Sequence, residues 1–217
     1  MLAQAVIFDL DGTLLDSLAD IGESMNLALA SMGLPVHPLD AYRAFVGDGV
    51  AMLARRALPE HCRNEKDVAG AVARMREIYQ GRCTQNTRPY RGIPALLDEL
   101  EARATRKAVL SNKPHDLTVA LVGSVLGAWR FEPVFGERPS VPRKPDPCGA
   151  LEIAARLALD PSRILYVGDT AIDIATARAA RMVAVGAAWG FRSEAELLAA
   201  GASAIVRRPL EVLEYLH

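Results

Sequence analysis

Cysteine is scarce in this sequence: it occurs three times in 217 residues, and the three positions are too far apart to form a CxxC pair. An odd number of thiols without framework spacing fits a reducing cytosol better than a secreted scaffold built on disulfides. We therefore expect a cytoplasmic protein in which the thiols of Cys62, Cys83 and Cys148 are unpaired and have no role.

Long apolar runs are also missing. No stretch approaches the ~20 consecutive apolar residues that a membrane-spanning helix needs. The first apolar run, residues 5–8, is too short for the hydrophobic part of a signal peptide, and acidic residues follow it directly. We expect a chain with neither a membrane span nor a signal peptide.

Charge of one sign does not dominate either. The 25 Lys and Arg residues nearly balance the 26 Asp and Glu residues, and neither sign forms a long run. This interleaving argues against a nucleic-acid or anionic-membrane partner, because either usually leaves a basic patch. With 51% hydrophobic and 24% charged residues, the composition is that of an ordinary soluble globular enzyme.

The chain does contain an alternation of short apolar runs and helical patterns. Five runs predict buried strands, at residues 5–8, 107–110, 164–167, 182–185 and 204–206. Continuous apolar runs, as opposed to alternating ones, suit parallel strands that are covered on both faces. Helical patterns lie between the later runs, at residues 93–100, 117–126 and 151–159. This order predicts an α/β fold with a doubly wound, Rossmann-like parallel sheet.

The segment that follows the first strand breaks this alternation. Up to about Thr84 it holds only helical patterns, so the first strand waits some 95 residues for its next parallel partner. Connections within a compact domain are usually far shorter. We therefore predict that residues 16–84 are a small, all-helical cap domain, inserted into a core domain formed by residues 1–15 and 85–217.

The strongest chemical signal is the run VIFDLDGT at residues 6–13, where a buried strand ends in two carboxylates, Asp9 and Asp11. At a spacing of two they project from the same side of an extended chain. Ligands of open α/β sheets bind outside the carboxyl ends of the strands. Gly12 lets the backbone approach a ligand closely, and Thr13 adds a hydroxyl. Two adjacent acids favour a bound cation, and magnesium suits one or two carboxylates plus substrate oxygens.

Two further polar loops follow predicted strands or precede helices. In VLSNKP, residues 109–114, Ser111 offers a hydroxyl beside helix-opening N–H groups, which suits a phosphate oxygen. A helix N-cap is the alternative interpretation. In RKPDP, residues 143–147, prolines fix the backbone around Lys144, whose ammonium could offset charge on a substrate. A solvated surface lysine is the alternative there.

A fourth signal lies at residues 164–173, ILYVGDTAID, where a buried strand ends at Asp169 and a second acid, Asp173, begins a helical pattern. Acids at a helix N-terminus are favourable in any case. All four signals, however, fall at the carboxyl ends of predicted parallel strands or in the loops before the next element. One crevice could therefore collect a nucleophilic carboxylate, further acids for a metal ion, a hydroxyl and a cation.

In order and spacing, these four runs resemble the four motifs of the haloacid dehalogenase superfamily, and the helical insertion looks like its small cap. The resemblance spans nearly the whole chain. It implies a magnesium-dependent phosphatase in which Asp9 is the nucleophile and a metal ligand, and Asp11 the general acid/base with its main-chain oxygen on the metal. Asp169 matches the remaining metal ligand, and Asp173 an acid that orders metal-bound water.

The same resemblance implies a phosphate-binding set. Ser111 and Lys144 match the groups that bind the transferring phosphoryl, and we expect Gly12, Thr13 and Asn112 to contribute to substrate binding. An aspartyl-phosphate would divide one difficult hydrolysis into two in-line displacements. The cap is expected to close over a small phosphorylated metabolite and to reopen for product.

The first motif and the cap argue against two of the reactions that this superfamily catalyses. A dehalogenase needs no acid two residues after its nucleophile, and the one cap lysine, Lys66, matches no phosphonate-hydrolysing pattern. The motifs look like those of phosphoglycolate phosphatases. A sugar-phosphate mutase, a pyrophosphatase or a nucleotidase of the same superfamily remains an alternative, and a binding protein without activity is a more distant one. The sequence does not give the oligomeric state.

Three smaller features lead to expectations of their own. The turn Gly47-Asp48-Gly49 in the predicted cap is either a specificity loop or a helix–helix turn. Arg181 stands where the family often has a glycine, which argues against a left-handed glycine helix terminus there. Trp189-Gly190-Phe191 could flank the site, but a packing turn is the favoured interpretation.

Overall fold

The computed structural model describes residues 2–217, which divide into two compact units. One unit comprises residues 2–16 and 89–217, and the other residues 17–88. The chain passes between them at Asp16–Ser17 and at Arg88–Pro89. The second unit therefore begins one residue later and ends four residues later than the segment 16–84 that the sequence predicted as the insertion.

The first unit is built on a six-stranded sheet in the order β5-β4-β1-β6-β7-β8. All five neighbouring pairs are parallel. The strands are β1 (Ala5–Phe8), β4 (Arg106–Pro114), β5 (Val134–Glu137), β6 (Ile164–Gly168), β7 (Val183–Ala187) and β8 (Ala204–Val206). The predicted doubly wound parallel sheet is confirmed. Strand β5, at the edge beside β4, was not predicted.

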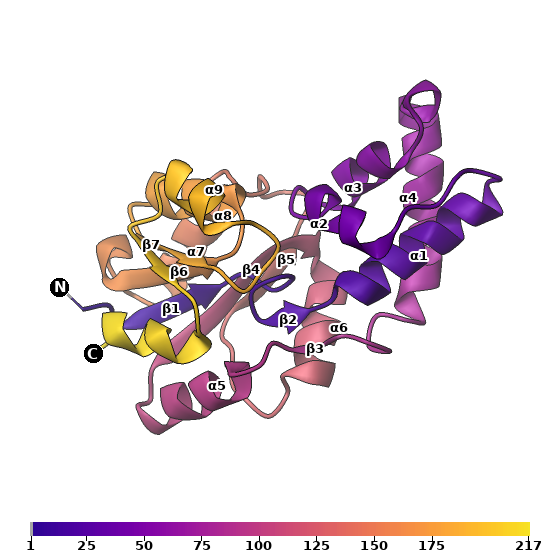
Figure 1. The fold of residues 1–217 in the computed structure, drawn as a ribbon. Helices are drawn as coiled ribbons and strands as arrows, with labels where there is room; N and C mark the ends of the chain where they lie inside the picture. Colours follow the sequence, from indigo (N-terminus) through magenta and orange to yellow (C-terminus); the bar gives the residue numbers. More distant parts are fainter. Residues whose placement is uncertain (1) are drawn as a thin grey trace. The chain divides into compact units, whose positions relative to one another are not determined.

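Helices cover both faces of this sheet (Figure 1). On one face α7, α8 and α9 bury a contiguous core against β-strand side chains such as Ile7 and Tyr166. On the other face lie α5 and α6. Their ranges are α5 (Ile93–Ala102), α6 (His115–Val125), α7 (Cys148–Arg156), α8 (Ala171–Ala179) and α9 (Glu194–Ala199). Strand β1 is fully buried, as a strand covered on both faces must be.

The second unit is helical. It holds α1 (Leu18–Ser31), α2 (Tyr42–Phe45), α3 (Val50–Ala57) and α4 (Glu65–Gln80), with short 3₁₀ turns at Leu39–Ala41 and Glu60–Cys62. The turn at residues 47–49 joins α2 to α3, and Asp48 forms an ion pair with Arg56 of α3. Two short strands, β2 (Leu15–Asp16) and β3 (Arg88–Pro89), form a separate two-stranded sheet. Within residues 2–217, no helix combines the length and apolarity needed to cross a bilayer.

The end of α8 corrects one expectation. Arg181 adopts the left-handed conformation, with φ of 58°, even though it carries a side chain. The N–H of Met182 donates to the Ala177 carbonyl at 2.8 Å, which is the long hydrogen bond of a Schellman motif. The expectation that the left-handed terminus is lost without glycine was wrong, because the hydrogen bonds of the motif hold the residue there.

The sheet register determines where the polar loops meet. Phe8, the last residue of β1, pairs with Val109 of β4 on one side and with Val167 of β6 on the other. The chains that continue past these three residues therefore emerge at the same edge of the sheet. The candidate site is assembled from these continuations.

Candidate active site

The turn after β1 is tight and requires glycine. The Asp9 N–H still donates to the Val167 carbonyl at 3.0 Å, and the chain then folds back so that Leu14 and Leu15 both donate to the Leu10 carbonyl. Gly12 has φ of 90°, and a β-carbon on it would lie 2.3 Å from Oδ2 of Asp169. A larger residue would displace Asp169, so Gly12 permits the first and last motifs to touch.

Three carboxylates converge beside this turn. Asp9, Asp169 and Asp173 each offer an oxygen, and these oxygens all lie within 4.8 Å of one another. Asp169 and Asp173 are completely buried, and Asp9 is 7% exposed. They come from the ends of two neighbouring strands, β1 and β6, and from the first turn of α8. The sequence spacing alone did not ensure this convergence; the parallel register produces it.

A buried ammonium group links two of the acids. Lys144 Nζ donates to Asp9 Oδ1 at 2.8 Å, to Asp173 Oδ1 at 2.7 Å and to the Leu110 carbonyl at 3.1 Å. The Lys144 side chain is only 4% exposed. Burial disfavours the charged form, but the Asp173 and Asp9 carboxylates more than offset it and hold the Lys144 pKa well above its usual range. Lys144 is therefore a fixed positive charge, and the interpretation as a solvated surface lysine is wrong.

The acids themselves carry excess negative charge. Burial raises the pKa of Asp9 well above its usual value; Lys144 opposes this, while the neighbouring Asp173 and Asp169 add to it. Burial, followed by the charge of Asp173, raises the pKa of Asp169 to about 7, even though Phe191 and Thr13 donate hydrogen bonds to it. One ammonium does not neutralise three crowded carboxylates.

Residues from two segments that are far apart in the sequence hold the Asp169 carboxylate in its orientation. Its Oδ1 accepts a hydrogen bond from the Thr13 hydroxyl at 2.9 Å, and its Oδ2 accepts one from the Phe191 N–H at 2.8 Å. A β-carbon on Gly190 would lie 2.3 Å from the Asp169 Cβ. The Trp189 indole N–H donates to the Thr13 carbonyl at 2.9 Å. Residues 189–191 therefore line the site, and the interpretation of this segment as a mere packing turn is wrong.

Asp173 has two roles at once. Its Oδ2 accepts hydrogen bonds from the N–H and the hydroxyl of Thr170, at 3.0 and 2.7 Å, and completes the capping box of α8. Its Oδ1 receives the Lys144 ammonium. The helix-capping interpretation thus holds together with membership in the acid cluster.

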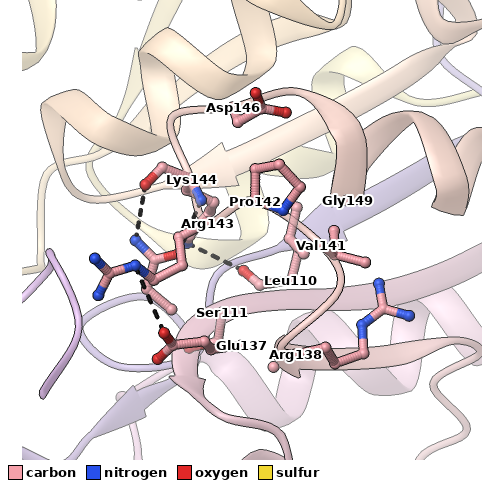
Figure 2. A pocket seen from close by; sticks show the side chains of 12 residues that line it. Leu110, Ser111, Glu137, Arg138, Val141, Pro142, Arg143, Lys144, Asp146 and Gly149 are labelled. Carbon is pink, nitrogen blue, oxygen red and sulfur yellow. Dashed lines mark hydrogen bonds and ion pairs between the residues drawn. The ribbon is translucent and has the colours of Figure 1, made fainter.

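The end of β4 positions Lys144. The Asn112 amide donates to the Lys144 carbonyl at 3.1 Å, and its oxygen accepts the Lys144 N–H at 3.0 Å, so one side chain holds both polar groups of that residue. The Ser111 hydroxyl accepts the Lys113 N–H at 3.2 Å. Ser111 and Lys144 are among the residues that line a small pocket, which is also lined by the ion-paired Arg143 and Glu137 (Figure 2).

Asp11 lies outside the acid cluster and has its own cation. Lys113 Nζ donates to both of its carboxylate oxygens, at 3.1 and 2.9 Å. Both side chains are largely withdrawn from solvent, with 7% of Lys113 and 11% of Asp11 exposed. The predicted contribution of Asp11 to the metal site was its main-chain oxygen, and that role stays a prediction.

The donor set fits a hard divalent cation. All three clustered side chains are carboxylates, whose oxygens are the ligands that Mg²⁺ prefers. Burial first, and then the neighbouring carboxylates, raise the pKa of Asp9 and of Asp169, and a bound cation would favour the ionised form of both. Lys144 contacts both Asp9 and Asp173, whereas Asp169 is held by the Phe191 N–H and the Thr13 hydroxyl and has no ammonium partner among the contacts described.

The structure brings most of the predicted site residues together. Asp9, Lys144, Asp169 and Asp173 lie together, as do Gly12 and Thr13 against Asp169. Asn112 contacts the Lys144 main chain, and its predicted role in substrate binding stays a prediction, as does that of Ser111. Sequence reasoning gave no role to Lys113 or to the Phe191 N–H. Lys113 was visible two residues after Ser111, on the same side of an extended strand, but a backbone N–H has no signature in a sequence.

Comparison with known proteins decides the family. The model of the family described as "Haloacid dehalogenase-like hydrolase" matches residues 6–187. The chain belongs to this family.

Its relatives are consistent with that assignment. The chain is 32% identical over 190 residues to a phosphoglycolate phosphatase of Xylella fastidiosa. The aligned region covers 88% of this chain and 82% of that protein. It is 33% identical over 204 residues to a plasmid-encoded phosphoglycolate phosphatase of Cupriavidus necator, covering 93% and 88% of the two chains. A crystal structure from Lactobacillus delbrueckii subsp. bulgaricus, described as a "putative phosphoglycolate phosphatase", superposes with a TM-score of 0.91 at 30% identity. That match covers 100% of this chain and 99% of the other.

Proposed function

We propose that this haloacid dehalogenase-like hydrolase is a magnesium-dependent phosphatase that hydrolyses a small phosphate monoester through an aspartyl-phosphate on Asp9. The observation that carries the proposal is the convergence of Asp9 with Asp169 and Asp173 around the fixed Lys144 ammonium. A carboxylate nucleophile beside a permanent positive charge and a set of hard oxygen donors suits phosphoryl transfer, where positioning and charge neutralisation do most of the catalysis.

Each residue has a defined task in this mechanism. An Asp9 oxygen attacks the phosphorus, and the ester oxygen leaves in line on the opposite side. Lys144 neutralises negative charge on the transferring phosphoryl and on the phosphorylated aspartate. Asp11 protonates the departing alkoxide and then takes a proton from the water that hydrolyses the aspartyl-phosphate. A Mg²⁺ ion held by Asp9, Asp169 and the Asp11 main-chain oxygen, with Asp173 ordering its water, would supply Lewis-acid stabilisation of the phosphoryl oxygens.

The proposed substrate is phosphoglycolate. Support comes from the names of the relatives at 32% and 33% identity, which cover nearly the whole chain. The helical unit 17–88 is proposed to be the cap that selects the substrate. We place the protein in the cytoplasm, where small phosphorylated metabolites occur.

The experiment is a phosphate-release assay with phosphoglycolate, pyrophosphate, a sugar phosphate and a nucleotide, each with Mg²⁺ or with a chelator. We expect magnesium-dependent release that is fastest with phosphoglycolate. Asp9→Asn should fold and release no phosphate, while Asp40→Asn, a change of an exposed carboxylate in the helical unit, should behave as the wild type.

Two results would refute the proposal. Full turnover by Asp9→Asn would exclude Asp9 as the nucleophile. Isomerisation of the sugar phosphate without phosphate release would instead indicate a mutase.

A further inference from the structure

Three hydrogen bonds form a closed ring around the Asp169 carboxylate. Its Oδ1 accepts the Thr13 hydroxyl at 2.9 Å, and its Oδ2 accepts the Phe191 N–H at 2.8 Å. The Thr13 carbonyl in turn accepts the Trp189 indole N–H at 2.9 Å. Because Trp189 is two residues before Phe191, the ring runs from one carboxylate oxygen to the other through Thr13, the indole and the main chain of residues 189–191.

The two donors to Asp169 lie on segments that the sheet does not join directly. Thr13 belongs to the turn after β1, and Phe191 belongs to the loop after β7. Strand β6 lies between β1 and β7, and Asp169 directly follows β6. The indole of Trp189 therefore links the two outer segments across the end of the strand that carries Asp169.

We propose that Trp189 is a positioning residue for the metal site: its indole N–H keeps the Thr13 and Phe191 donors in register, so that Asp169 is held in the orientation that binds the divalent cation. This inference rests on the proposed function, because the cation is the one proposed there. The carboxylate torsion of an aspartate is soft, so its orientation depends on the donors that hold its oxygens. Thr13 is fully buried, and the loss of the indole donor from its carbonyl would favour a shift of the turn.

A purely structural role for Trp189 makes a different prediction. If the indole only packs in its loop, its removal lowers stability and leaves the magnesium affinity of the folded protein unchanged. If it acts on Asp169 through Thr13, its removal lowers that affinity, and the loss is coupled to the loss of the Thr13 hydroxyl. A double-mutant cycle on magnesium affinity therefore separates the two roles, because residues that act through one another are not additive.

The experiment measures the magnesium dissociation constant by calorimetry, without substrate, in the wild type, Trp189→Phe, Thr13→Val and the double variant. Each single substitution should weaken binding about 10-fold, the lower end of the range for groups that support a metal ligand. The double variant should lose far less than the roughly 100-fold product of the two single losses. Trp129→Phe is the matched control: Trp129 is also half-buried and donates its indole N–H to Asp98 at 2.8 Å, so the affinity should not change.

The possible failures are distinguishable. Wild-type affinity in Trp189→Phe, or fully additive losses in the double variant, would overturn the inference and leave the phosphatase proposal standing. If the wild type itself does not bind Mg²⁺, the proposed function fails and the inference fails with it.

A second variant guards against a Trp189→Phe protein that does not fold, which urea unfolding in a chelator would reveal. In the Trp129→Phe protein, position 189 holds the one remaining tryptophan of the chain. Incorporation of 3-benzothienylalanine there keeps the shape of the indole and replaces its N–H with sulfur. The same loss of about 10-fold in magnesium affinity is expected, and an unchanged affinity would overturn the inference.

Discussion

Gly190 lies so close to Asp169 that a β-carbon at position 190 would be 2.3 Å from the Asp169 Cβ and 2.5 Å from the Gly12 carbonyl oxygen. Two loops that are far apart in the sequence thereby fix one carboxylate between them. The Phe191 N–H and the Thr13 hydroxyl, which hydrogen-bond its two oxygens, complete that arrangement. The geometry of Asp169 depends on backbone packing as much as on its own strand.

Replacing Gly190 with alanine should therefore weaken metal binding more than folding. The methyl group displaces Asp169, and we expect magnesium affinity to fall about 10- to 100-fold, as for losses of supporting contacts at other metal sites. The overpacking should cost about 1–3 kcal/mol of unfolding free energy. Magnesium titration followed by calorimetry measures the first effect and urea unfolding the second. Gly123→Ala is the matched control, because nothing lies within 4 Å of a β-carbon there; equal magnesium affinity in both variants would contradict the prediction.

Removing the buried ammonium should be costly even without substrate. Lys144→Met leaves Asp9 and Asp173 without their shared donor, and breaking a buried ion pair in this way typically costs about 3–5 kcal/mol. Adding Asp173→Asn to Lys144→Met removes one of the two carboxylates that have lost their ammonium partner. The double variant should therefore be more stable than Lys144→Met alone. Urea unfolding of the three proteins in a chelator tests this order. A Lys144→Met protein as stable as the wild type would show that the ammonium does not compensate these acids.

The helical unit contains a carboxylate whose effect on stability depends on pH. Asp20 is fully buried, and burial raises its pKa, but hydrogen bonds from Thr87 and Asn86 together outweigh this and lower the pKa below its usual value. The Thr87 hydroxyl and N–H donate at 2.7 and 2.8 Å. Because the folded pKa is lower than the unfolded one, the stabilisation is complete above an unfolded pKa of about 4 and is lost as the pH falls through the folded value.

Asp20→Asn should accordingly destabilise the protein at neutral pH by about 1–3 kcal/mol, the usual cost of losing hydrogen bonds to a charged group. The difference from the wild type should shrink on acidification below about pH 4. Thermal unfolding of both proteins across that range provides the measurement. A difference that stayed constant with pH would mean that the Asp20 charge does not matter.

Among residues 2–217, three non-glycine residues adopt the left-handed conformation, which costs roughly 1–2 kcal/mol for a residue with a β-carbon. They are Ala104, Ala158 and Arg181, with φ of 51°, 50° and 58°. Arg181→Gly should raise the unfolding free energy by about 0.5–1 kcal/mol, because relief of strain exceeds the added entropy of the unfolded chain. Gly201, with φ of 94°, ends α9 in the same way, so Gly201→Ala should destabilise. Guanidinium unfolding measures both changes; destabilisation by Arg181→Gly, or stabilisation by Gly201→Ala, would contradict this explanation.

Much of the core could be predicted from the sequence, for identifiable reasons. Strands β1 and β8 were predicted with their observed limits, because continuous apolar runs bounded by polar residues are characteristic of buried parallel strands. Strand β5 (Val134–Glu137) was missed: it is an edge strand with two large apolar residues followed by glycine. Its pairing with β4 depends on the neighbouring chain, and a short apolar run alone does not distinguish such a strand from a loop.

The sequence predicted the site residues that are recognised by their side-chain type and their place after a strand. It did not predict contacts that depend on side-chain orientation or on the main chain. Asp9 and Asp169 follow buried strands, so the edge of a parallel sheet was expected to collect them. The Asp11–Lys113 pair depends on which way two side chains turn at the ends of adjacent strands. The contribution of Phe191 is a main-chain N–H, which any residue type except proline supplies. Residue identity therefore does not reveal the Phe191 contact, and the position of Lys113 two residues after Ser111 did not by itself identify Asp11 as its partner.

The central claim is that Asp9 and Asp169 share one divalent cation, and the most direct measurement is anomalous X-ray scattering from crystals soaked in Mn²⁺ as a stand-in for Mg²⁺. The account predicts one strong anomalous peak in the site, within about 2.3 Å of a carboxylate oxygen of both Asp9 and Asp169, because hard divalent cations bind oxygen at such distances. The peak should vanish in Asp169→Asn crystals. A peak bound by only one of the two acids, or no peak at saturating Mn²⁺, would contradict the account.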